Sequence, residues 1–364
     1  PNQSATKIRH LLDTVDPDRT RDLRAGTIDS WVVWHLSGGT AHLTDSSNAG
    51  ITGLLATDGS GWDLDAAAHL RIPDAALPRI VDTVGAAAEA TALPGAPPIL
   101  AIAGDQQASL AVQGCVAPGQ AKATFGTGAM LDLVLGAERP TFTVRGPGGT
   151  FPIAAWRRAG ELTWGIEAIM LSAGTNVEWL RDDLGLLTTV EESHEVAQGC
   201  ASTDGVVYVP ALLGLGTPQW DYGARGTLLG ITRGTGRAEV VRAVLEGVAQ
   251  RGADLLDAAE AYGGHRIASL RVDGGMSCNP TFTQALADAV QRPVEVSPVV
   301  EATAVGAGLL ASLADGTRTT WDDVAATWTP ARVVEPGAPL DRERWADAIE
   351  RARAWYPDLS GVDF

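Results

Sequence analysis

Residues 104–107, with the sequence Gly-Asp-Gln-Gln, place a carboxylate directly after the apolar run at residues 99–103. In open α/β sheets, ligands bind beyond the carboxyl ends of the strands, so Asp105 would lie at the mouth of a cleft. A carboxylate there can accept the proton of a hydroxyl group as a general base. Aspartate is also a preferred N-cap residue, and these four residues alone favour a capping role.

Two glycine-rich segments could approach phosphate groups. In the Phe-Gly-Thr-Gly sequence at residues 125–128, Gly126 and Gly128 would let backbone N–H groups reach an anion, with the Thr127 hydroxyl beside them. Most such hairpins are only turns, so this signal is weak alone. Residues 272–279 precede Pro280, and their Gly-Gly pair beside a helix start could accommodate an adenosine or phosphate group. They do not fit the GxGxxG pattern, and the sequence has no P-loop motif.

Other catalytic patterns are missing from the sequence. The six histidines are scattered, with no HExxH motif and no partner for a GxSxG serine, which argues against zinc and serine hydrolases. Cys115, Cys200 and Cys278 are widely separated and lack zinc-ligand spacing. This argues against a disulfide framework and against a structural zinc site.

Strands and helices that could position these segments alternate along the chain. Before residue 114 helices are expected to dominate, with a strand at 99–103. A glycine-tipped hairpin is expected next, from strands at 121–125 and 130–135. This alternation indicates an α/β fold with a largely parallel or mixed sheet. The other predicted elements are helices over 7–15, 26–36, 166–184, 237–262 and 280–290, and strands at 206–209 and 270–272.

Length and composition indicate a globular protein of two domains. The 364 residues, 45% hydrophobic and 20% charged, exclude a small module and a disordered chain. Turn residues at 114–119 separate a mostly helical pattern from a pattern of alternating strands and helices, so the expected domains are residues 1–118 and 119–364. A net charge of -17 argues against a nucleic-acid partner. The most apolar stretch is far shorter than a membrane span of about 20 residues, and no secretion signal is visible, so a cytoplasmic location is expected.

Taken together and in order, these segments resemble the FGGY family of carbohydrate kinases, most of all its glycerol-phosphorylating members. The resemblance implies an actin-like ATPase fold of two ribonuclease-H-like α/β domains, with part of the first and all of the second present. It further implies ATP-dependent phosphorylation of a terminal hydroxyl of glycerol or a related polyol or sugar, with Mg²⁺ as the metal. A homo-oligomer is also implied. The matching segments lie at residues 4–8, 26–31, 44–49, 103–107, 125–128, 226–234, 272–275 and 301–307.

The resemblance assigns roles residue by residue. Asp105 corresponds to the catalytic base and also binds the polyol, beside Gln106, which reverses the capping interpretation. No side chain is assigned as a metal ligand. Phosphoryl transfer depends mainly on positioning and electrostatic stabilisation, so backbone donors, Mg²⁺ and one base suffice. Family positions that contact the nucleotide are matched by Gly126, Thr127, Gly128, Gly174, Glu178, Gly275 and Asn279.

The sequence departs from the family at the acceptor positions. Asn2 stands where glycerol-phosphorylating members have a tyrosine, and Met130 stands where they have a phenylalanine. Glu178 replaces a glutamine beside the nucleotide. We therefore expect a preferred acceptor other than glycerol, such as a larger or more polar polyol or sugar.

A larger departure concerns the family's amino-terminal segment, which carries the first phosphate loop and an Arg-Glu pair that holds the polyol. The resemblance begins partway through the first domain, so the expectation is a truncated kinase sequence, with negligible activity if these residues are the whole protein. One alternative is a non-catalytic relative that still binds sugar or nucleotide. Another is an actin-like ATPase module that binds partners, which the Asp-Gln-Gln sequence disfavours.

Overall fold

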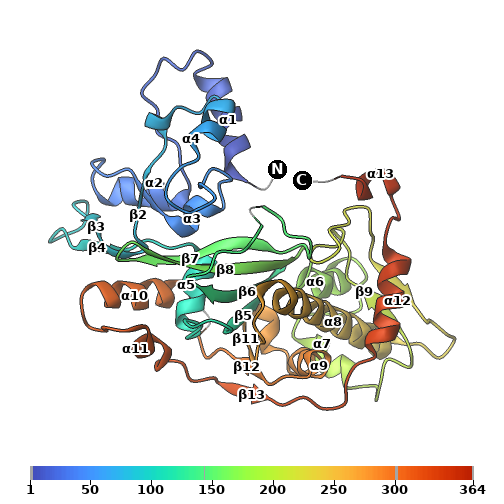
Figure 1. Ribbon diagram of the computed structural model, residues 1–364. Helices are drawn as coiled ribbons and strands as arrows, with labels where there is room; N and C mark the ends of the chain where they lie inside the picture. The colour runs from blue at the N-terminus through green and yellow to red at the C-terminus, as the bar shows by residue number, and fades with distance from the viewer. Residues whose placement is uncertain (1–2, 143, 300–301, 363–364) are drawn as a thin grey trace.

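The computed structural model describes residues 3–142, 144–299 and 302–362, and their main feature is a nine-stranded mixed sheet (Figure 1). Its strand order is β13-β12-β11-β5-β6-β8-β7-β3-β4. The strands are β3 (Val84–Glu89), β4 (Pro98–Ala101), β5 (Ala121–Phe125), β6 (Ala129–Gly136), β7 (Phe151–Arg158), β8 (Glu161–Met170), β11 (Leu270–Asp273), β12 (Val294–Val296) and β13 (Arg332–Val334).

Parallel and antiparallel pairs both occur in this sheet. β5 pairs antiparallel with β6, and β6 with β8, while β11 runs parallel to both β5 and β12. The mixed sheet predicted from the alternation of elements is therefore confirmed. The predicted hairpin at residues 121–135 is confirmed too, with Phe125 opposite Ala129 across its tip.

Helices cover both faces of the sheet, as side chains alternate along each strand. On one face, Ala123, Leu131 and Ile166 pack in one core with α8 (Arg237–Gly263) and α9 (Pro280–Val290). On the other, Val134 of β6 packs with Leu110 of α5 (Asp105–Val112). α10 (Ala302–Ala314) packs against α5 on that second face.

The segment up to residue 81 forms a separate lobe, coloured blue above the sheet in Figure 1. It holds the short parallel pair β1 (Leu43–Asp45) and β2 (Arg79–Val81). Buried Asp45 caps α3 by accepting from the backbone N–H groups of Ser47 and Asn48, and it accepts from the Thr83 hydroxyl at 2.6 Å. Burial raises the pKa of the Asp45 carboxyl. The lobe's helices are α1 (Ser4–Val15), α2 (Ile28–Leu36), α3 (Ser46–Gly50) and α4 (Leu64–His69).

One expectation about the elements is wrong. Residues 166–170 were assigned to a helix, but they end β8, and α6 covers only Thr175–Asp182. The reason is a period of two: Ile166, Ala168 and Met170 are buried on one face while Glu167 lies on the other. Before residue 114 helices dominate as expected and β4 corresponds to the predicted strand at 99–103, while β1, β2 and β3 are further strands that the sequence did not predict.

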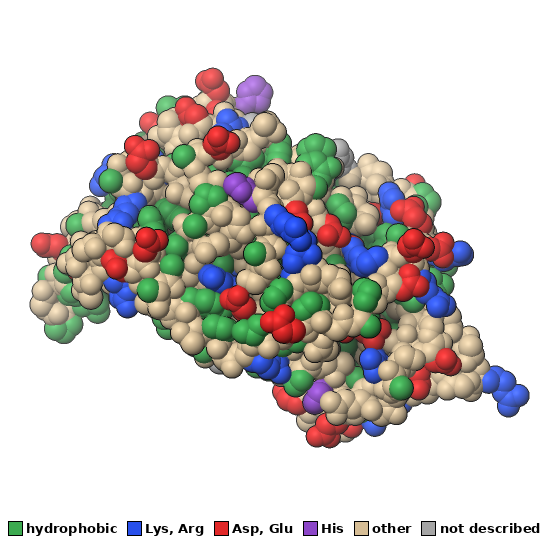
Figure 2. Space-filling view, turned by 60° about the horizontal axis from the view of Figure 1, so that its bottom comes forward, with side chains coloured by type: hydrophobic (Ala, Val, Ile, Leu, Met, Phe, Trp, Pro, Cys, Tyr) green, Lys and Arg blue, Asp and Glu red, His purple; other side chains and the backbone are tan. Residues whose placement is uncertain are grey.

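Acidic and basic side chains are interspersed on the face of the molecule shown in Figure 2. Within the described residues, no helix has the length and apolar character that crossing a membrane would require. The remaining elements are β9 (Val207–Val209), β10 (Thr227–Leu229), α7 (Glu192–Ala197), α11 (Trp321–Ala325), α12 (Arg342–Ala352) and α13 (Pro357–Ser360). Most of them pack outside the central sheet, with α7 and β9 against α8, α12 and β10 against β9, and α11 against α5.

Candidate active site

Asp105 is the first residue of α5 and its side chain is exposed. The N-cap is Gly104, whose N–H donates to Ser47 Oγ at 2.8 Å. Asp105 Oδ1 accepts only a local bond of 2.8 Å, from the Gln106 N–H. The capping alternative is therefore wrong, because the carboxylate is one position inside the helix. An exposed carboxylate in this position can take a proton from a bound hydroxyl.

Gln106 points from the first turn of α5 to the middle of the sheet, where its Oε1 accepts from Lys122 Nζ. Lys122 also donates to Thr124 Oγ1 at 3.0 Å. Met130 is opposite Thr124 in the β5–β6 register and is half-buried on this same face. The structure thus brings Asp105, Gln106 and Met130, predicted to contact the acceptor, to one face of the sheet. Asn2, the fourth such residue, lies outside the described residues.

The glycine hairpin lies against the start of α6. The Gly126 N–H donates to Gly128 O at 2.9 Å, which closes the turn and leaves Thr127 exposed at its tip. Gly126 O then accepts from the Gly174 N–H at 2.8 Å. These bonds hold the hairpin tip beside the first turn of α6, where Glu178 is exposed one turn later.

The Gly-Gly pair after β11 completes a cradle of backbone. Gly274 has φ +85°, and a Cβ at this position would lie 2.5 Å from Phe125 O, so only glycine fits. Gly275 is exposed, with open space around it among the described residues. Segments far apart in sequence therefore present glycine backbone at one place, an arrangement that suits an anionic ligand.

Asn279 plays a structural part in the same region. Its Oδ1 accepts from the Phe282 N–H at 3.1 Å and so caps α9, and its Nδ2 donates to Ser193 Oγ at 2.9 Å. A contact of Asn279 with adenosine stays a prediction, and it would have to coexist with these two bonds.

Sequence reasoning missed a set of buried charged residues beneath α5. Lys122 Nζ lies 2.8 Å from Asp132 Oδ2, and both side chains are fully buried. The two groups form an ion pair, but the Asp132 oxygens have no hydrogen-bond partner among the described residues. Lys122 is one of only two lysines in the chain, which was the available signal. Glu167 lies opposite Asp132, and part of its side chain is exposed. Removal of its carboxyl group from water, together with the negative charge of Asp132, raises the pKa of Glu167 to about 8.

Asp273, at the end of β11, ties that strand to α5. Its Oδ2 accepts from Ser109 Oγ and from Gln113 Nε2, each at 2.9 Å. Its Oδ1 is buried with no partner among the described residues. The strand that leads into Gly274 is thereby bonded to the helix that carries Asp105.

No group of three or more histidine, cysteine or acidic side chains in the described ranges is arranged to hold a metal ion. Mg²⁺ in phosphate-transfer sites usually takes one or two carboxylates, with substrate phosphates and water completing its shell. The exposed carboxylate of Asp105 has the chemistry that such a Mg²⁺ ion needs, on the helix that Asp273 bonds to the strand leading into Gly274.

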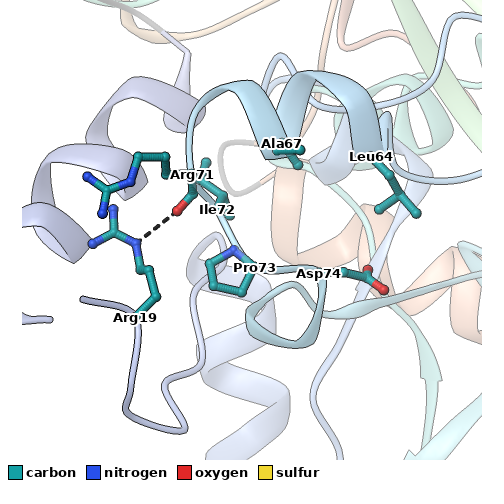
Figure 3. Close-up of a pocket in the computed structure, with 8 residues that line it drawn as sticks. Arg19, Leu64, Ala67, Arg71, Ile72, Pro73 and Asp74 are labelled. Carbon is teal, nitrogen blue, oxygen red and sulfur yellow. Dashed lines mark hydrogen bonds between the residues drawn. The ribbon is translucent and has the colours of Figure 1, made fainter. Parts of the chain in front are cut away.

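The pocket in Figure 3, of about 360 Å³, lies in the amino-terminal lobe and away from this cradle. Its two arginines are engaged, since Arg19 Nε donates to Arg71 O at 2.8 Å and Arg71 donates to Pro17 O. None of the residues discussed above lines it, so it is not the candidate site. Its lining residues are Arg19, Leu64, Ala67, Ala68, Arg71, Ile72, Pro73 and Asp74.

Comparisons with known proteins agree with this geometry. Residues 1–111 match the N-terminal domain of the FGGY family of carbohydrate kinases, and residues 121–314 match the C-terminal domain. A glycerol kinase of Aromatoleum aromaticum is 43% identical over 363 residues, which cover 97% of this chain and 72% of that protein. One from Dechloromonas aromatica is 42% identical over the same shares. The crystal structure of Plasmodium falciparum glycerol kinase with ADP superposes with a TM-score of 0.86 at 28% identity, covering 95% of this chain and 71% of that one.

Proposed function

The chain belongs to the FGGY family of carbohydrate kinases, with its actin-like ATPase fold and ATP-dependent phosphorylation of a sugar or polyol, and we propose that its acceptor is glycerol or a closely related polyol. The observation that carries this proposal is the position of Asp105. It is exposed at the start of α5, on the same face of the sheet as Gln106 and Met130.

In this proposal Asp105 accepts the proton of the attacking hydroxyl while the γ-phosphoryl group moves to the hydroxyl oxygen and ADP leaves. Gln106 and Met130 hold the acceptor. Gly126, Thr127 and Gly128 contact the phosphates through backbone N–H groups and the Thr127 hydroxyl. Positioning of this kind supplies most of the catalysis in phosphoryl transfer.

Nucleotide contacts beyond the phosphates are proposed for Gly174, Glu178, Gly275 and Asn279. The bonds between Gly126 and Gly174, and the close approach of Gly274 to Phe125, support a common site for these segments. Mg²⁺ would be held mainly by the ATP phosphates, with the Asp105 carboxylate available to it, and it would supply neutralisation of the phosphate charge.

The acceptor lies between two domains, which we propose to be residues 1–118 and 119–364. Asp105 belongs to the first, and the glycine hairpin to the second. Met130 is long, flexible and unbranched, so it would shape a less rigid wall than an aromatic ring and could admit acceptors larger than glycerol. A homo-oligomer and a cytoplasmic location are proposed on the same family likeness.

The test is Asp105→Asn, which keeps the size of the side chain and removes the base. We expect turnover to fall by about 10²- to 10⁴-fold, while the Kd for ATP, measured by isothermal titration calorimetry, stays unchanged. Acceptors are compared by ADP release with glycerol, erythritol and xylitol. Wild-type turnover in the variant would show that Asp105 is not the base, and no ADP release with any polyol would reject the proposed acceptor class.

A further inference from the structure

A row of charged side chains crosses the sheet beneath α5. In register, Glu295 of β12 is opposite Arg271 of β11, which is opposite Lys122 of β5; Lys122 is opposite Asp132 of β6, which is opposite Glu167 of β8. Lys122 and Asp132 are fully buried at the centre of this row. Neither is needed to hold phosphates or to accept a proton in the mechanism above.

Stability alone is a poor reason for such a pair. Taking two charges out of water costs several kcal/mol per ion, and apolar residues of similar volume often replace a buried pair with no loss of stability. The pair is better explained by something that it orients. The side chain that Lys122 contacts on α5 is Gln106, the neighbour of Asp105.

Lys122 determines which end of the Gln106 amide faces it. An ammonium group has three N–H donors and no acceptor. Lys122 forms an ion pair with Asp132 Oδ2 and donates hydrogen bonds to Thr124 Oγ1 and Gln106 Oε1. The Gln106 oxygen must therefore face Lys122, because the flipped amide would place N–H groups against a cation. The NH2 end is then the one directed away from Lys122.

We propose that Lys122, anchored by Asp132, is a positioning residue that fixes the orientation of the Gln106 amide. The NH2 group of Gln106 then donates to the hydroxyl of the polyol that is adjacent to the hydroxyl being phosphorylated. The inference rests on the proposed contact of Gln106 with the acceptor. A site built to bond a hydroxyl discriminates against an analogue that lacks it. Lys122 and Asp132 would thus set acceptor specificity without touching the acceptor.

The experiment replaces the pair by apolar residues, as Lys122→Met with Asp132→Leu in one protein. We expect the free energy of unfolding, measured with urea, to be unchanged or higher, and the KM for ATP to be unchanged. The KM for glycerol should rise about tenfold, as expected for the loss of roughly one hydrogen bond. Propane-1,3-diol lacks the neighbouring hydroxyl, so its KM should hardly change. In a Gln106→Leu background the same replacement should have no further effect, because the two act through one contact.

A control removes an ion pair of the same 2.8 Å length that is only partly buried, Arg242–Glu246 on α8, as Arg242→Met with Glu246→Leu. This helix covers the opposite face of the sheet. This control should not alter the KM for glycerol. The inference would be overturned if the double replacement raised the KM equally for glycerol and propane-1,3-diol, or if its effect added to that of Gln106→Leu. In that case, turnover of glycerol by the wild-type enzyme would still uphold the proposed function. A wild-type enzyme inactive with polyols would overturn both. If Lys122→Met with Asp132→Leu does not fold, Asp132→Asn, which keeps the shape and weakens the anchor, must show the same difference between the two acceptors.

Discussion

Gly306 marks the closest approach of α10 to α5, and replacing it tests whether the position of Asp105 controls turnover. A Cβ at Gly306 would lie 1.9 Å from Ala108 O, whereas real Cβ contacts are essentially never under 3.0 Å. In Gly306→Ala the two helices must therefore separate by about 1.1 Å. Ala108 is in the first turns of α5, so a shift of α5 would carry Asp105 with it.

A misplacement of about 1 Å can cost about 10²-fold in rate, so we expect kcat of Gly306→Ala to fall about 100-fold. Overpacking should also lower the free energy of unfolding by about 1–3 kcal/mol. The Kd for ATP should not change, because the proposed nucleotide contacts lie on the hairpin, α6 and the loop after β11. Steady-state kinetics, urea unfolding and calorimetry measure these three quantities.

Gly308 provides the control on the same helix. It is exposed, and no described atom lies within 4 Å of where its Cβ would stand. Gly308→Ala should keep kcat and gain up to about 1 kcal/mol from the better helix propensity of alanine. If Gly306→Ala folds and retains wild-type kcat, or if both variants lose activity equally, the positional reasoning is refuted.

Three further predictions concern the cradle and the charged row. Gly274→Ala should destabilise the protein by about 1–3 kcal/mol, because of its positive φ and the contact with Phe125 O, and Gly275→Ala should leave stability unchanged; urea unfolding compares the two. Burial raises the pKa of Glu167 from 4.5 to about 8 in the folded protein, so its contribution to stability is present at low pH and is lost as pH rises from about 4.5 to 8. Stability measured at pH 5.5 and 8.5 should therefore fall less in Glu167→Gln than in the wild type, and an equal fall would contradict the assignment. Glu178→Gln should tighten ATP binding by removing a negative charge near the nucleotide, and the gain should shrink at 1 M salt. An unchanged Kd would contradict the proposed contact of Glu178 with the nucleotide.

Sequence patterns predicted long helices and the glycine hairpin well, because each is specified by local signals. α8 and α9 follow from uninterrupted apolar spacing and from Pro280 at a helix start. The end of β8 was missed since a run such as 166–170 fits a helix as well as a strand until its neighbours in the sheet are known. Asp105 could be proposed from the sequence because its neighbours form a motif.

The charged row could not be found in this way. Lys122 and Asp132 lie on the two strands of the predicted hairpin, and Asp132 interrupts an apolar run, but only the register of β5 and β6 shows that the two residues are opposite each other. Glu167 joins them only through the pairing of β6 with β8. Likewise, the bond from Ser109 to Asp273 joins residues that are 164 positions apart.

The alternation along β5, β6 and β8 also bears on how the sheet assembles. One face of these strands is purely apolar beneath α8, and the other carries Lys122, Asp132 and Glu167. A register shift of one residue would exchange the two faces of a strand and place an ammonium or carboxylate group in the apolar core beneath α8. Intermediates with the wrong strand register are therefore much higher in free energy. The charged residues thus favour the correct register during folding, in addition to their contacts in the native state.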